Sequence, residues 1–173
     1  MKILTVSGSL RQRSSNRAML QAYARVLPKE WTVSDFDGFA RLPHFNPDLD
    51  GDNVDREVAK WRRAVGEADA VIVSTPEYAH ALPGSFKNGL DWLVSDPAFA
   101  GKRVIVIKAD RGTDFATDSL QEVLRTMSAN ILEEACVGLA LTTNSITTEQ
   151  ILARDDLRSR LEASVQRLIA SFQ

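Results

Sequence analysis

Three serines, an asparagine and two arginines stand within nine residues, in the stretch GSLRQRSSN at positions 8–16. This stretch follows the apolar run ILTVS and precedes RAMLQAYARVL, in which apolar residues recur at helical spacing. Backbone amides at a helix start lie at the positive end of the helix dipole and favour an anion. Side-chain donors that suit phosphate oxygens come from Ser9, Arg11, Ser14 and Asn16. The stretch therefore predicts a phosphate-binding turn.

The alternative for these serines is a plain helix cap. Ser14 or Ser15 could close the first turn of the helix alone, and a cap needs only one such residue. The cluster exceeds that need, so phosphate binding is favoured. The turn has neither the GxGxxG spacing of a dinucleotide site nor a Walker A motif, which favours a phosphate monoester.

A second stretch, STPEYAHALPGSFKNGLDWL at positions 74–93, combines turn residues with aromatic and charged ones. Pro76, Pro83 and Gly84 predict a rigid turn, and a rigid turn can aim its backbone groups at a planar polar ring. Tyr78 would either stack on such a ring or fill a groove beside it. Glu77 resembles a general base, but the sequence offers no partner for its carboxylate in that role.

Histidine and cysteine chemistry is weakly supported. His44 and His80 are the only histidines and lie far apart, so we expect no metal site and no Ser/His nucleophile pair. Cys136 is the only cysteine, which excludes an intrachain disulfide and a CxxC redox pair and favours a reducing compartment.

Alternating short apolar runs and amphipathic segments indicate how these stretches are positioned. Five runs are expected to be strands, at residues 2–7, 31–36, 68–76, 102–109 and 129–137. Consecutive apolar residues within the third and fourth runs are typical of parallel strands buried on both faces. With right-handed crossovers, these strands predict an α/β, doubly wound three-layer sandwich with a five-stranded parallel sheet. Its ligands would lie beyond the carboxyl ends of the strands.

Two further segments complete the expected organisation. Residues 37–53 are rich in Pro, Gly, Asn and Asp and predict a long surface loop, which either borders a ligand or is a plain excursion. Residues 148–171 predict one final helix with a single apolar stripe. We expect residues 1–173 to form a single domain.

Bulk composition limits the classes of function. The chain has 173 residues, of which 44% are hydrophobic and 25% charged, with a formal net charge of −2. These values are typical of a globular domain and provide no overall field that would attract nucleic acid or an anionic membrane. An apolar run of about 18 residues, as a membrane span requires, is absent from the sequence. A cytoplasmic protein is expected.

Both stretches resemble the signature segments of the NAD(P)H-dependent FMN reductase family, a flavodoxin-like group that includes quinone, chromate and azo-dye reductases. The family pattern GSLRxxSxN is matched by Gly8, Ser9, Leu10, Arg11, Ser14 and Asn16. The family's TPEYN loop is matched at Thr75, Pro76, Glu77 and Tyr78, while Ala79 replaces the frequent Asn. The resemblance covers roughly residues 1–137.

This resemblance implies a site and a reaction. FMN would be the cofactor, with its phosphate and ring held by Ser9, Arg11, Ser14, Ser15, Asn16, Pro76, Glu77, Tyr78 and Ala79. NAD(P)H would pass a hydride through flavin N5 to a quinone, free flavin or another soluble acceptor. Because the chemistry belongs to the flavin, no catalytic side chain is expected. The family also implies a homodimer or homotetramer.

Two other functions remain open at this point. A flavodoxin-type electron carrier would hold FMN without oxidising nicotinamide, although such carriers are usually strongly acidic. A binding or regulatory domain that has lost its flavin is suggested by Ala79 and by Asp110, which depart from the family pattern. A phosphoryl-receiver domain is disfavoured, because no carboxylate lies between residues 7 and 13. The choice between NADH and NADPH is also open.

Overall fold

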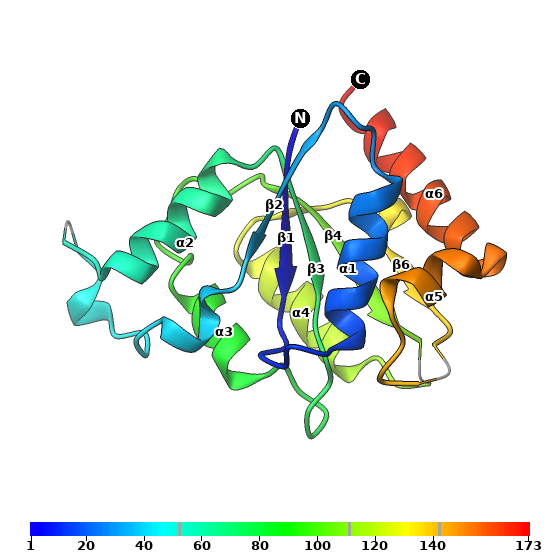
Figure 1. Cartoon of the computed structure of the whole chain (residues 1–173). Coiled ribbons are helices and arrows are strands. Elements are labelled where there is room, and N and C mark those ends of the chain that lie inside the picture. Colours follow the sequence, from blue (N-terminus) through cyan, green and yellow to red (C-terminus); the bar gives the residue numbers. More distant parts are fainter. Residues whose placement is uncertain (52, 111, 142) are drawn as a thin grey trace.

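Strands and helices alternate along the chain in the computed structural model of the protein (Figure 1), which describes residues 1–51, 53–110, 112–141 and 143–173. The strands are β1 (Lys2–Ser7), β2 (Thr32–Phe36), β3 (Ala70–Ser74), β4 (Arg103–Ala109), β5 (Asn130–Ile131) and β6 (Val137–Leu139). The helices are α1 (Ser15–Val26), α2 (Arg56–Glu67), α3 (Gly84–Asp91), α4 (Phe115–Thr126), α5 (Thr148–Ala153) and α6 (Asp155–Ala170).

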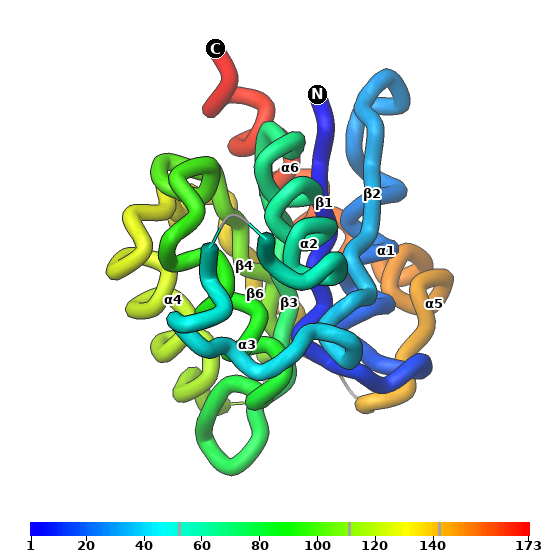
Figure 2. Tube along the Cα trace, turned by 90° about the vertical axis from the view of Figure 1, so that its left-hand side faces the viewer, coloured from blue at the N-terminus to red at the C-terminus, as the bar shows by residue number. Residues whose placement is uncertain are grey.

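All the strands run parallel in one sheet with the order β2-β1-β3-β4-β5, and β6 also pairs with β4. One apolar cluster packs the sheet against α1, α5 and α6, and a second packs it against α2, α3 and α4. Alternate strand residues such as Ile3 and Leu4 enter opposite clusters, which explains the consecutive apolar residues in the sequence. The predicted flavodoxin-like three-layer fold is confirmed, as the two views show (Figures 1 and 2).

The fifth strand is not the continuous segment that the sequence predicted. β5 pairs with the start of β4 and β6 with its end, and a 3₁₀ turn at Glu133–Ala135 separates them. The interruption removes a backbone partner from the Val106 amide, which instead donates to the Cys136 sulfur at 3.3 Å. The thiol therefore completes the hydrogen bonding of the sheet at the break.

The predicted final helix at residues 148–171 is also divided. Arg154 has extended backbone dihedrals (φ −91°, ψ 111°), so α5 ends before it and α6 begins after it. Asp155 and Asp156 occupy the first turn of α6, where negative charge is favoured, and the Arg154 guanidinium pairs with Asp156. These acidic residues explain why a new helix starts here although the apolar stripe continues.

The segment 37–53 is more than a plain excursion over the surface. It contains 3₁₀ turns at Gly38–Arg41 and Pro47–Leu49, and Phe39 is buried in the core on the α2 side of the sheet. Asn88 of α3 binds the segment through two hydrogen bonds of 2.8 and 2.9 Å. The segment thus packs against α3, whose preceding loop lies at the carboxyl edge of the sheet.

Candidate functional site

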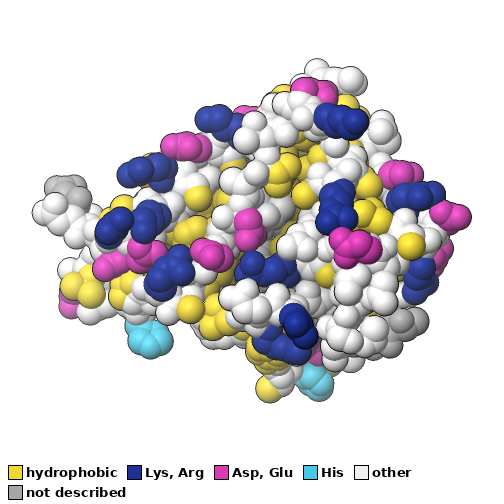
Figure 3. Space-filling view, viewed as in Figure 1, with side chains coloured by type: hydrophobic (Ala, Val, Ile, Leu, Met, Phe, Trp, Pro, Cys, Tyr) yellow, Lys and Arg dark blue, Asp and Glu magenta, His cyan; other side chains and the backbone are white. Residues whose placement is uncertain are grey.

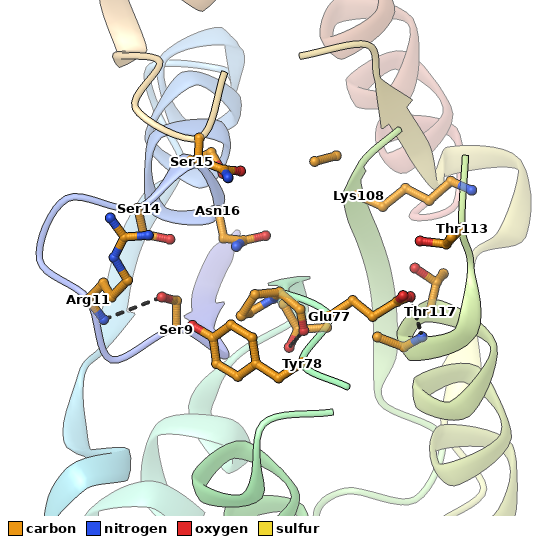
Figure 4. A pocket seen from close by; sticks show the side chains of 15 residues that line it. Ser9, Arg11, Ser14, Ser15, Asn16, Glu77, Tyr78, Lys108, Thr113 and Thr117 are labelled. Atoms are coloured by element: carbon orange, nitrogen blue, oxygen red, sulfur yellow. Dashed lines mark hydrogen bonds between the residues drawn. The ribbon is translucent and has the colours of Figure 1, made fainter. Parts of the chain in front are cut away.

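A cavity of about 290 Å³ lies beyond the carboxyl ends of β1, β3 and β4 (Figure 4). Three loops meet there because parallel strands end at the same edge of the sheet. The lining residues are Ser9, Arg11, Ser14, Ser15 and Asn16 after β1; Thr75, Pro76, Glu77 and Tyr78 after β3; Lys108, Ala109, Thr113, Ala116 and Thr117 around the end of β4; and Asn144. Every predicted site residue except Ala79 belongs to this set.

The turn after β1 presents donors to the cavity. Ser14 occupies the cap position of α1, but within the described residues its side chain makes no capping hydrogen bond. The first-turn amides are therefore not used by a serine cap, contrary to the alternative that the sequence left open. The Ser9 hydroxyl accepts a 3.3 Å hydrogen bond from the Arg11 amide, which folds the turn back toward the cavity. This is a donor set suited to a phosphate.

Contacts with β3 fix this turn in place. The Gly8 amide donates to the Ser74 carbonyl at 2.9 Å, and the Ser74 hydroxyl donates to the Asn16 side-chain oxygen at 2.9 Å. A Cβ at Gly8 would lie 2.3 Å from the Thr75 hydroxyl oxygen, so no larger residue fits at this approach. The turn after β1 and the loop after β3 are thus held together as one wall.

The loop after β3 forms a tight two-residue hairpin. Tyr78 and Ala81 exchange two backbone hydrogen bonds of 3.0 Å, while Ala79 and His80 have φ of 50° and 60°. Two successive positive φ angles define the favoured hairpin turn, in which Asn is better tolerated than Ala. Ala79 lies at the hairpin tip and is not among the described residues that line the cavity. Its place in the cofactor site therefore stays a prediction.

Glu77 has a partner that the sequence did not reveal. One of its carboxylate oxygens accepts a 3.1 Å hydrogen bond from the Ala116 amide in the first turn of α4. Asp114 stands at the cap position of α4, yet among the described contacts its side chain makes no capping bond. Glu77 thus caps α4 from another loop and connects two walls of the cavity.

The loop after β4 was expected near the ligand, but none of its side chains was among the predicted site residues. Lys108 lines the cavity with its side chain, while its ammonium pairs with Asp114 and points away from Asn16 (Figure 4). The rule that ligands lie beyond strand ends indicates this loop, but it does not single out Lys108 or the start of α4. Asn144 carries no such signal, because the segment after β6 has no recognisable pattern.

Exposed aromatic side chains form the rim of the cavity. Tyr78 is 49% and Phe115 52% exposed, and the His80 ring stacks on Phe115 with centroids 4.3 Å apart and an interplanar angle of 18°. Leu10, on the turn after β1, is 52% exposed. A wall of hydrogen-bond donors therefore adjoins exposed aromatic surface suited to planar molecules.

The described residues contain no group of three or more His, Cys, Asp or Glu side chains placed to hold a metal ion. Within the same part of the chain, none of the helices combines the length and apolar character that crossing a membrane requires.

Comparisons with known proteins converge on one family. The family model described as NADPH-dependent FMN reductase matches residues 1–143. The NAD(P)H-dependent FMN reductase of Pseudomonas aeruginosa is 28% identical over 172 residues, covering 96% of this chain and 92% of that protein. The quinone reductase of Escherichia coli K12 is 29% identical over 115 residues, covering 65% of this chain and 61% of that protein.

A solved structure supports the fold. The flavoenzyme NAD(P)H:(acceptor) oxidoreductase from Paracoccus denitrificans has a TM-score of 0.73 and 22% sequence identity. The match covers 98% of this chain and 97% of that chain.

Proposed function

The chain belongs to the NADPH-dependent FMN reductase family, and from this premise we propose that it is an FMN-dependent NAD(P)H oxidoreductase. Its electron acceptors would be small molecules of the quinone type, as the name of the related Escherichia coli quinone reductase indicates for that protein. Free flavin is a further acceptor to be considered.

The residues present fit FMN. One observation carries the proposal: the start of α1 and the rigid loop after β3 line the same cavity. Within the described residues, the Ser14 side chain does not cap the start of α1. Amide and guanidinium donors on the first wall match a dianionic phosphate. Gly8 permits the close approach of the two walls, so phosphate and ring would be held at a fixed separation.

When bound, FMN supplies hydride and electron transfer, and the chain supplies position and electrostatics. In the proposed site, Arg11 and the first-turn amides of α1 bind the phosphate. Backbone groups of Pro76 and Glu77 orient the ring, and Glu77 keeps this loop attached to α4. Tyr78, half exposed at the rim, bounds the side from which NAD(P)H and the acceptor approach.

The test is an anaerobic visible spectrum of the purified protein with FMN, before and after NADPH or NADH is added in separate cuvettes. We expect loss of the flavin absorption at catalytic protein concentrations, and its return when a quinone is added. Bound flavin that stays oxidised would instead indicate an electron carrier. Failure to bind FMN would overturn the proposal.

We also propose that the protein forms a homodimer or homotetramer, as the family resemblance implies. Exposed apolar surface at Leu10, Tyr78 and Phe115 adjoins the cavity and would be covered by a second copy. Light scattering coupled to size-exclusion chromatography measures the assembled mass. A monomer at all protein concentrations would contradict the expected assembly while leaving the reductase proposal to its own test.

A further inference from the structure

A second groove, of about 410 Å³, adjoins the cavity at Ser14 and runs between α1 and the start of α5. We call it the arginine groove; it is lined by Gln12, Arg13, Ser14, Arg17, Ala18, Gln21, Ser145, Ile146, Thr147, Thr148 and Glu149. We propose that the arginine groove binds the adenosine phosphate part of a dinucleotide whose other part occupies the neighbouring cavity. This inference rests on the proposed function, and it adds a second binding site to it.

Two arginines at the groove have few partners in the rest of the protein. Arg13 is exposed and has no ion pair or side-chain hydrogen bond within the described residues. The Nε atom of Arg17 is buried and lacks a hydrogen-bond partner in the same set. The only ion pair found for Arg17 there is a long contact of 3.7 Å with Asp35. The Arg17 side chain as a whole is 25% exposed, so its guanidinium is available to an anionic ligand in the groove.

The positive charge on this part of the chain exceeds what one phosphate monoester requires. Arg11 already faces the cavity, whereas Arg13 and Arg17 line the arginine groove. Figure 3 shows basic side chains over the turn between β1 and α1, at the lower edge of the molecule. A second phosphate beside the first would engage the two remaining guanidinium groups.

The carboxylates near the groove do not cancel this charge. Glu149 lines the groove but forms a 2.9 Å ion pair with Arg25. Asp35 accepts a 3.1 Å hydrogen bond from the Thr5 hydroxyl, and it is not among the described residues that line the groove. Net positive charge therefore remains on the wall that Arg13 and Arg17 form.

The other lining groups suit a nucleoside. Ala18 and Ile146 form an apolar base of the groove, although both are mostly buried in the core. The Gln21 side-chain oxygen accepts from the Thr148 hydroxyl at 2.9 Å, so Gln21 has its amide N–H groups left for a ligand. Thr147 and Gln150 satisfy each other in a capping box, and the α5 start therefore contributes no free cap. The groups available to bind an adenosine phosphate are therefore Arg13, Arg17 and the Gln12 and Gln21 side chains.

Two dinucleotides carry the required chemistry. The adenylate half of FAD continues directly from the phosphate that the α1 turn would hold. The 2′-phosphoadenosine half of NADPH would instead reach the groove from a nicotinamide placed over the ring. Both present an adenosine phosphate to the same arginines, and they are separated by comparing FAD with FMN and NADP⁺ with NAD⁺.

The experiment uses Arg13→Ala and Arg17→Ala, with Arg11→Ala as the variant of the cavity. Arg160→Ala is the control for charge, because Arg160 is exposed on α6 away from both sites. Calorimetric titration measures FMN and FAD binding to flavin-free protein, and NADP⁺ and NAD⁺ binding to FMN-loaded protein. Circular dichroism melts verify that each variant is folded.

We expect Arg13→Ala and Arg17→Ala each to raise the dissociation constant of FAD or of NADP⁺ roughly 10- to 100-fold. This change corresponds to the loss of one charge-assisted hydrogen bond. FMN should bind almost unchanged, NAD⁺ should be weakened less than NADP⁺ because it lacks the 2′-phosphate, and Arg160→Ala should match the unsubstituted protein. Unchanged FAD and NADP⁺ affinities in both variants would overturn the inference. Equal weakening of FMN would also overturn it, since the arginines would then belong to the flavin phosphate site.

Failure of the proposed function is distinguishable from failure of this inference. If the protein binds no flavin, adenosine 2′,5′-bisphosphate titrated onto it still probes the arginine groove. Binding that requires Arg13 and Arg17 but not Arg11 supports the groove. Absence of binding, or binding that depends only on Arg11, contradicts it.

Discussion

Arg11 allows the most direct test of the phosphate site. Its side chain is exposed at the mouth of the cavity, and replacement by Ala removes one guanidinium without disturbing the core. We expect Arg11→Ala to weaken FMN binding by about 1–3 kcal/mol, the value of a charge-assisted hydrogen bond to phosphate. Fluorescence titration of FMN measures the change, with Arg160→Ala as the control. An unchanged dissociation constant would place the Arg11 side chain in solvent.

Ala79 allows a test of backbone strain. Its φ of 50° lies in the left-handed region, which disfavours Ala by about 1–2 kcal/mol relative to residues that adopt it readily. We therefore expect Ala79→Asn to raise the free energy of unfolding by about 0.5–1 kcal/mol and Ala79→Val to lower it. Urea denaturation compares the two variants. If Val is tolerated as well as Asn, the hairpin does not require a left-handed residue.

At this scale the sequence predicted which residues lie together where one short motif carries them, and that they bind a cofactor stays a prediction. Ser9, Arg11 and Asn16 lie together because one short turn carries them. For Ala79 the sequence left the role of the position undefined, because a residue type alone does not distinguish a ligand contact from a conformational preference. The structure places the position at a hairpin tip with positive φ.

At the level of elements, Glu77 joins the loop after β3 to α4. Removing its carboxylate leaves the α4 start without the only side-chain cap found for it in the described residues. We expect Glu77→Ala to lower the free energy of unfolding by about 0.5–2 kcal/mol, and Glu77→Gln, which keeps an acceptor, to lose less. Hydrogen exchange of the Ala116 amide should accelerate in the Ala variant. If the Ala116 amide exchanges at the same rate in Glu77→Ala and Glu77→Gln, the hydrogen bond is not maintained in solution.

Cys136 lies at the break in the fifth strand and connects this break to β4. Its sulfur accepts from the Val106 amide, so Cys136→Ala would leave a buried donor without a partner. We expect a loss of about 1–3 kcal/mol in the free energy of unfolding, with Cys136→Ser recovering part of it through its hydroxyl. Guanidinium denaturation provides the comparison. Equal stability of the two variants would assign the effect to lost volume instead.

The same cysteine should be slow to react and should make stability depend on alkaline pH. Burial raises the pKa of the Cys136 thiol above its ordinary value of 9.0, an effect that the Val106 hydrogen bond reduces. A folded-state pKa above the unfolded value means that the thiol contributes its full stability below pH 9. This contribution is lost as pH rises toward the folded-state pKa. Thiol labelling at pH 8 should therefore be much slower in native than in denatured protein.

Helices and strands were predictable where one apolar periodicity persisted. The prediction failed where polar residues interrupted an element. Consecutive apolar residues in β3 and β4 identified buried parallel strands. The turn at Glu133–Ala135 and the break at Arg154 were missed, because apolar patterns continue across both positions. Acidic residues adjoin each break, and they were the available signal.

At the scale of the whole molecule, Gly89 controls how the segment 37–53 packs. A Cβ at this position would lie 2.3 Å from the Phe39 ring, so Gly89→Ala should lower the free energy of unfolding by about 1–3 kcal/mol through overpacking. Gly66→Ala is the matched control in α2, where the nearest atom would be 3.6 Å away. That control should stabilise by about 0.5–1 kcal/mol. Thermal unfolding by calorimetry measures both, and a neutral Gly89→Ala would mean that Phe39 moves freely.

The architecture followed from the sequence because strand and helix patterns alternate, and parallel strands bring their carboxyl ends to one edge. Contacts between loops distant in the chain did not follow, since no local pattern encodes them. Glu77 with Ala116, and Ser14 with the segment around Thr147, meet only after the sheet has formed. The arginine groove is therefore a feature of the folded chain alone.

The break in the fifth strand also limits how copies of the protein can associate. β5 has two residues and β6 has three, and a turn of 3₁₀ helix lies between them. Incoming polypeptide would find no continuous row of amide and carbonyl groups along this border, so intermolecular β-sheet growth, the first step of fibril formation, has little template there. A long uninterrupted strand at the same place would have made the protein more prone to aggregate.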